Sequence, residues 1–298
     1  MATKITEKTR QEYEQWVEED TELAEEFSDK LNALFFRMLK NPSDKEIDTF
    51  KTARDALIIA FLLELMEKYK EQLPLSMNIG KEVAKEQIKR LGIEKVVKKT
   101  INEEKFKNMI DSVIESNQTT IAYVLDDIKV NTDNIIKDIK SNVIETKKVL
   151  SAELAAQFQK NGISEFRDKI GRRISITNYI KQKSLDEITK IMRNSYFMQA
   201  IRYGVPYVRI VHLNLHPHCP LCEPFTNKIL ALQENDKGVM TMAEAAQLGL
   251  FHEYCDDVPM GMLLENEYTE KEIEIKLNKE NKKRQEYNKK RGYKSPFG

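Results

Sequence analysis

The apolar residues of the chain follow two different patterns, which change near residue 205. Before that point they recur every three or four positions, and this spacing places them on one face of an α-helix. The clearest stripe predicts a single helix over residues 119–162. Its members are Ile128, Thr132, Ile135, Ile139, Val143, Thr146, Leu150 and Leu154.

The distribution of proline supports a helical first part. No proline occurs between Pro74 and Pro206, and helices avoid proline because it removes a backbone donor and clashes with the preceding turn. Ser43 and Glu46 also have the spacing of a capping box at a helix start. We therefore expect residues 1–204 to form an elongated, mainly α region. Its other predicted helices cover residues 8–39, 44–72, 81–91, 101–117 and 173–203.

After residue 205, short runs of β-branched and aromatic residues replace the helical period. The segments VPYVRIVHL, NKILAL and VPMGMLL are typical of strands. Between the last two, Thr241 and Glu244 have capping-box spacing, and Gly249 predicts the end of that short helix. We therefore predict a small α+β module over residues 205–265, followed by a charged, helix-prone tail over residues 266–298.

Composition narrows the range of partners. The 298 residues include 48 Lys or Arg and 48 Asp or Glu, so no net charge attracts the chain to nucleic acid or to a membrane surface. The most apolar run, ALIIAFLL, is far shorter than the roughly 20 residues of a membrane-spanning helix, and we expect no membrane partner.

All three cysteines and all four histidines lie between His212 and Cys255. Cys219 and Cys222 are separated by two residues, and His252 and Cys255 repeat that spacing. One tight turn can present two side chains at this spacing to one metal ion, and zinc prefers four tetrahedral sulfur or nitrogen ligands. We predict that these four residues bind a structural Zn²⁺, whose binding energy stabilises a module too small to bury much core.

The fourth ligand has an alternative, because His216 or His218 could replace His252. A catalytic zinc site is not indicated, since four protein ligands leave no open position for water. The sequence also lacks the glycine-rich loops that bind nucleotides. We therefore expect a protein that is not an enzyme. The alternative is a zinc-dependent nucleic-acid-binding or nuclease-like protein with a treble-clef-like centre, although His216 and His218 precede the first cysteine and have no evident catalytic partner.

Residues 170–265 resemble the minor capsid, or head morphogenesis, proteins of tailed bacteriophages, the minor capsid protein 2 and Mu F-like group. The resemblance rests on a helix ending at Tyr203-Gly204, the segment CPLC at 219–222, Asn227-Lys228, and GLFH at 249–252 with Cys255. The sequence departs from the family pattern at Glu253, where the family has proline, and at Asp256-Asp257, where it has Arg-His. The presumed ligands are kept while their neighbours change, which favours a structural role for them.

The resemblance implies a structural protein of the virion, present in few copies at the portal vertex or in the capsid interior. It implies assembly in the bacterial cytoplasm, help in capsid assembly and in DNA packaging or ejection, and the portal protein as partner, with the major capsid protein as a further candidate. The N-terminal helical region would dock on the portal or capsid.

The basic tail, KLNKENKKRQEYNKKRGYK, has two interpretations. Its cations could lie along the phosphates of packaged DNA, or the segment could be a solvated, partly disordered terminus. The candidate nucleic-acid contacts are Lys282, Lys283, Arg284, Lys289, Lys290 and Arg291.

Overall fold

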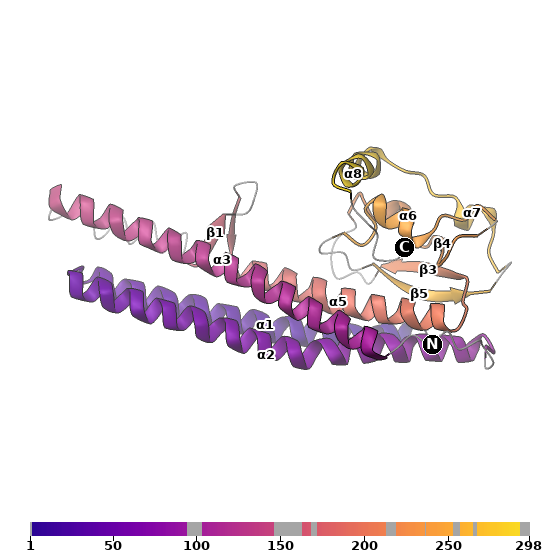
Figure 1. Cartoon of the computed structure of the whole chain (residues 1–298), viewed down its shortest axis with the longest axis horizontal. Helices are drawn as coiled ribbons and strands as arrows, with labels where there is room; N and C mark the ends of the chain where they lie inside the picture. The colour runs from indigo at the N-terminus through magenta and orange to yellow at the C-terminus, as the bar shows by residue number, and fades with distance from the viewer. Residues whose placement is uncertain are drawn as a thin grey trace. The chain divides into compact units, whose positions relative to one another are not determined.

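The computed structural model describes residues 2–93, 103–145, 163–167, 172–212, 219–235, 237–252, 257–264 and 267–292. Within these residues the protein is mainly helical and has a small sheet region (Figure 1). The long helices are α1 (Ala2–Leu39), α2 (Asp44–Arg90), α3 (Glu103–Glu145) and α5 (Ile176–Arg202). The shorter elements are β1 (Glu165–Arg167), β2 (Arg173–Ser175), β3 (Tyr207–His212), η1 (Glu223–Phe225), β4 (Ile229–Ala231), α6 (Met242–Gln247), β5 (Asp257–Leu263), α7 (Glu270–Ile273) and α8 (Lys279–Lys290).

The long helices do not break where the sequence suggests. The predicted end at residue 72 is wrong, because α2 continues through Pro74 to Arg90. Packing on both sides of the proline offsets the lost hydrogen bond: Leu73 is fully buried, and the buried Ser76 hydroxyl donates to the Ile188 carbonyl at 2.6 Å. The predicted break between residues 117 and 119 is also wrong, because α3 is continuous there. The remainder of the predicted 119–162 helix, after residue 145, lies outside the described residues.

The chain divides into two compact units. The helical unit comprises Gln15–Glu71 and Asp111–Ser184, and the mixed unit comprises Met1–Glu14, Gln72–Ile110 and Leu185–Gly298. The two units are described separately below.

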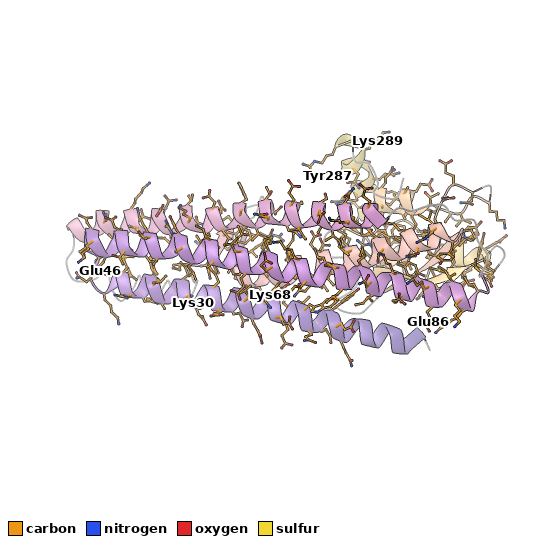
Figure 2. The ribbon with its side chains drawn as sticks, turned by 60° about the horizontal axis from the view of Figure 1, so that its bottom comes forward. Lys30, Glu46, Lys68, Glu86, Tyr287 and Lys289 are labelled. Carbon is orange, nitrogen blue, oxygen red and sulfur yellow. The ribbon has the colours of Figure 1, made fainter. Side chains whose placement is uncertain are left out.

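Packed aromatic rings and one buried arginine organise the helical unit. The rings of Phe27 and Phe61, from α1 and α2, lie 4.6 Å apart. Arg54 on α2 is 1% exposed, and its guanidinium group pairs with Asp55 at 2.9 Å and with Asp133 of α3 at 2.7 Å. Burying this cation is tolerated because carboxylates and a hydroxyl satisfy it. Figure 2 labels Lys30, an exposed residue of α1, and Lys68 of α2, whose ammonium group lies 3.8 Å from the Glu19 carboxylate of α1.

A short antiparallel hairpin, β1 with β2, belongs to the same unit and was not predicted from the sequence. Phe166 of β1 packs edge-on against Tyr179 of α5, with 5.2 Å between ring centroids. The Asn131 side chain of α3 donates to the Glu165 carbonyl. Strands of three residues carry too little alternation to be recognised by pattern.

The mixed unit contains a three-stranded antiparallel sheet in the order β4-β3-β5, which confirms the three predicted strands (Figure 1). A small buried cluster lies within the sheet region itself and contains Tyr207, Ile229, Ala231 and Val239. The larger cluster is shared with two long helices. Val208 of β3 and Phe225 of η1 join Val83 of α2 and Phe197 of α5 in one buried cluster. The Gln87 side chain of α2 also accepts hydrogen bonds from the Tyr196 hydroxyl of α5 and the Met262 amide of β5. The sheet and the helices α2 and α5 therefore share one core.

Among the residues that the structure describes, no helix combines the length and the apolarity that crossing a bilayer requires.

Candidate metal centre

The CPLC segment forms a tight turn directly before η1. The amides of Cys222 and Glu223 both donate to the Cys219 carbonyl, at 3.1 and 3.0 Å. The Cys222 amide also lies 3.3 Å from the Cys219 sulfur and donates to it. Pro220 lies inside the turn, and its fixed φ restricts the backbone there. Local backbone geometry therefore brings both sulfurs to the same side of the turn, as the two-residue spacing predicts.

The end of α6 positions His252. Thr241 and Glu244 form the predicted capping box at the start of this helix. At its end, Gly249 has φ +106°, and the amides of Gly249 and Leu250 donate to the carbonyls of Ala246 and Ala245. This pair of bonds is a Schellman motif, which requires a left-handed residue and explains the glycine. The chain leaves the helix toward the cysteine turn, and His252 follows two residues after the motif.

Cys219, Cys222 and His252 converge on one point. Their three ligand atoms lie within 4.8 Å of one another, and the Cys219 sulfur is 2.9 Å from His252 Nε2. In a tetrahedral zinc site a sulfur and a nitrogen ligand lie about 3.5 Å apart, given Zn–S of about 2.3 Å and Zn–N of about 2.0 Å. Separating the hydrogen-bonded sulfur and nitrogen by about 0.6 Å would therefore admit the ion.

The electrostatics of the group favour a metal ligand. A hydrogen bond from the Cys222 side chain, followed by hydrogen bonding and charge from His252, lowers the pKa of the Cys219 thiol to about 4 despite partial burial. Cys219 is thus a thiolate at neutral pH, which is the form that binds metals. Cys222 is 3% exposed and belongs to the shared core. Two sulfurs and one imidazole, partly shielded from water, suit Zn²⁺.

The other candidate ligands cannot be placed. The predicted fourth ligand, Cys255, lies outside the described residues, as do the alternatives His216 and His218. Three of the four predicted ligands are therefore brought together, and the group could hold a metal ion.

Residues from two other helices surround the centre, and the sequence did not single them out. The Arg193 guanidinium of α5 lies 4.2 Å from the centroid of Phe251, next to His252. Asn278, which precedes α8, and Asn281 on α8 donate to the carbonyls of Pro220 and Leu221. The only signal for these asparagines is their three-residue spacing, which is typical of a helix N-cap.

The candidate nucleic-acid contacts lie at the α8 helix. Lys282, Lys283, Lys289 and Lys290 are exposed on α8, and Arg291 is exposed immediately after it. Arg284 is partly buried, with its guanidinium 5.3 Å from the centroid of the Tyr287 ring. The predicted helical character of the tail is confirmed over Lys279–Lys290.

Comparison of the chain with protein-family models, curated proteins and solved structures gives no match.

Proposed function

We propose that Cys219, Cys222 and His252 bind one structural Zn²⁺, with Cys255 as the fourth ligand. The observation that carries this proposal is the convergence of three metal-ligating atoms from two segments thirty residues apart. The thiolate form of Cys219 and the burial of Cys222 support it. A zinc ion at this point would join the turn after β3 to the segment after α6.

We further propose that the protein is a non-enzymatic minor capsid protein of a tailed bacteriophage, located at the portal vertex or inside the capsid. The support is the spacing of CPLC and GLFH in the family pattern, together with the helical character of the first two hundred residues. In this proposal the zinc centre has a structural role, joining the turn after β3 to the segment after α6. The long helices contact the portal protein, and the major capsid protein is a second candidate partner.

The helical unit offers a surface for that contact. Ile59 and Leu63 on α2 are 60% and 59% exposed, and Tyr123 on α3 is 71% exposed. Ile59 and Leu63 are four residues apart and so share one face of α2, and exposed apolar side chains that gather on one face are typical of protein interfaces. We propose these side chains as part of the surface that meets the portal or capsid.

Elemental analysis of the purified protein tests the metal centre. We expect one zinc per chain, lost in the Cys222→Ser variant. A metal-free native protein would contradict the proposal. Zinc-dependent cleavage of DNA by the purified protein would instead support the nuclease-like alternative.

Virion incorporation tests the second proposal. The protein should co-purify with virions and with a portal ring in a fixed, low stoichiometry. Leu63→Gln should reduce incorporation, whereas the adjacent, exposed Glu64→Gln should not. A protein absent from purified virions would refute the assignment.

A further inference from the structure

The basic helix α8 is held to the mixed unit by asparagine side chains. Asn281 is fully buried, and its side-chain amide donates to the carbonyls of Leu221 and Leu248 at 3.0 and 3.1 Å. The side-chain oxygen of Asn281 accepts a hydrogen bond from the backbone amide of Asn278 at 3.1 Å. Asn288, which is 6% exposed, donates to the Gln247 carbonyl at 2.9 Å. The inward face of α8 is thus polar, and each bond has a specific partner.

Two side-chain hydrogen bonds from the start of this helix end on the cysteine turn itself. Asn278 donates to the Pro220 carbonyl at 2.6 Å, and Asn281 to the Leu221 carbonyl. Pro220 and Leu221 are the two residues between Cys219 and Cys222. The direction of their carbonyls depends on the conformation of the turn, which a metal bound to both cysteines would fix. Part of the attachment of α8 therefore depends on the proposed metal centre, whereas the bonds to Leu248 and Gln247 do not end on it.

The opposite face of α8 is strongly basic. Lysines recur there at spacings of three, four and seven residues, which place them on one side of a helix. Figure 2 shows Lys289 and Tyr287 on α8, and both residues are exposed. The helix also has two acidic residues: Glu280 pairs with Lys283 at 2.9 Å, and Glu286 lies among the lysines, three residues from Lys283 and from Lys289. The exposed lysines of α8 are Lys279, Lys282, Lys283, Lys289 and Lys290.

We propose that this lysine face of α8 binds the phosphate backbone of duplex DNA, and that binding requires α8 to be docked on the metal-binding turn. The inference rests on the proposed metal centre. The 12 residues of α8 extend about 18 Å, a length over which duplex DNA carries about ten negative charges. Lysines act as point charges toward phosphates and read no base sequence, so the binding is independent of sequence.

A membrane surface fits this face less well than DNA. Helices that lie on membranes bury a face of Trp, Phe or Leu in the lipid, whereas α8 has Tyr287 as its only aromatic residue and no aliphatic one. Tyr287 is itself flanked by cations, because the Arg284 and Arg291 guanidinium groups lie 5.3 and 5.2 Å from its ring centroid.

The first experiment measures the affinity of the full chain for a fluorescent DNA duplex at several salt concentrations. In the K289Q/K290Q variant we expect the slope of log K against log salt to fall by about 2, and the affinity at about 0.1 M salt to fall at least tenfold. Lys30→Gln, an exposed lysine of the helical unit, is the matched control and should change neither. An unchanged slope in K289Q/K290Q would overturn the proposal, as would equal affinity for polyglutamate.

The second experiment tests the docking of α8. Asn281→Asp removes both donated bonds and places a carboxylate against two carbonyls, whereas Gln285→Glu makes the same change of charge at an exposed position of the same helix. We expect Asn281→Asp to weaken DNA binding at least fivefold more than Gln285→Glu, and to increase hydrogen exchange in α8 while circular dichroism stays native. Equal effects of the two variants would overturn the dependence on docking.

Metal content separates this inference from the proposed function. If the native protein lacks zinc but Asn281→Asp still weakens DNA binding, the metal centre fails and the DNA-binding face stands. If zinc is present but the lysine variants bind DNA normally, the metal centre stands and this inference fails.

Discussion

The close approach of α2 and α5 in the mixed unit gives a sharp prediction at Gly80. A methyl group at this position would lie 2.0 Å from the Ser195 hydroxyl oxygen and 2.2 Å from the Met192 carbonyl oxygen. The Ser195 hydroxyl itself donates to the Met192 carbonyl at 2.8 Å. Gly80→Ala should therefore push the two helices apart, because a backbone carbonyl cannot rotate away as a side chain can.

The magnitude follows from two opposing effects. Relieving the contact requires a shift of about 1 Å, and overpacking of a close-packed core costs about 3 kcal/mol when backbone must move. The higher helix propensity of alanine returns about 1 kcal/mol. We expect a net loss of about 2 kcal/mol, which corresponds to a decrease in melting temperature of about 4–8 °C for a unit of this size.

Thermal and urea unfolding followed by circular dichroism measure this loss, and hydrogen exchange locates it in α2 and α5. Ser195→Ala removes the nearer of the two clashing atoms and is the companion variant. The double variant should recover only part of the lost stability, because the Met192 carbonyl remains. If Gly80→Ala stabilises the protein by about 1 kcal/mol, as helix propensity alone predicts, or if Ser195→Ala restores stability completely, the close backbone approach is refuted.

Four further predictions concern the metal site and the buried arginine. Chelation should increase hydrogen exchange at Cys222 and in α8 while β3 stays protected; uniform loss of protection would contradict the shared core. The thiolate absorbance of Cys219 can be measured in the metal-free protein as the difference from the Cys219→Ser variant. This absorbance should persist on acidification until the pH nears 4. A midpoint near the ordinary thiol pKa would contradict the hydrogen bonds that Cys219 makes with Cys222 and His252. Because folding lowers this pKa from 9.0, the metal-free protein should lose stability as the pH falls from 9 toward 4. Arg54→Leu should destabilise the protein by about 2 kcal/mol in urea unfolding, because it removes the guanidinium that pairs with Asp55 and Asp133 and donates to the buried Thr132 hydroxyl. The exposed Lys30→Leu should stay within about 0.5 kcal/mol.

Local signals in the sequence were sufficient where the interaction itself is local. The capping box of Thr241 and Glu244 and the helix ends at Gly204 and Gly249 depend on hydrogen bonds within one or two turns, and both glycines have positive φ. The cysteine turn is equally local, since its bonds join residues three or four apart. The meeting of His252 with that turn could be predicted because metal-ligating side chains are few in this chain.

Features that depend on distant partners were not visible in the pattern. Pro74 is a helix breaker by local rules, yet the packing of Leu73 and Ser76 carries α2 through it. The sequence of α8 has no apolar stripe, and such a sequence predicts a helix that is solvated on all sides. In the structure α8 docks through Asn281, which donates to the backbone carbonyls of Leu221 and Leu248. Any residue has such a carbonyl, so the sequence pattern cannot identify these partners.

The shared core changes the role expected for a metal ion. From the sequence, a module of about sixty residues needs a zinc ion to remain folded, because so small a chain buries little apolar surface. In the structure, the fully buried Val208 and Phe225 pack in one cluster with Val83 of α2 and Phe197 of α5. The sheet therefore has apolar partners whether or not a metal is bound. A bound ion would add a constraint on the Cys219–Cys222 turn, which its own backbone hydrogen bonds already define. Through the turn it would also constrain the two carbonyls that accept from Asn278 and Asn281. A metal at this site would act mainly by positioning the basic helix.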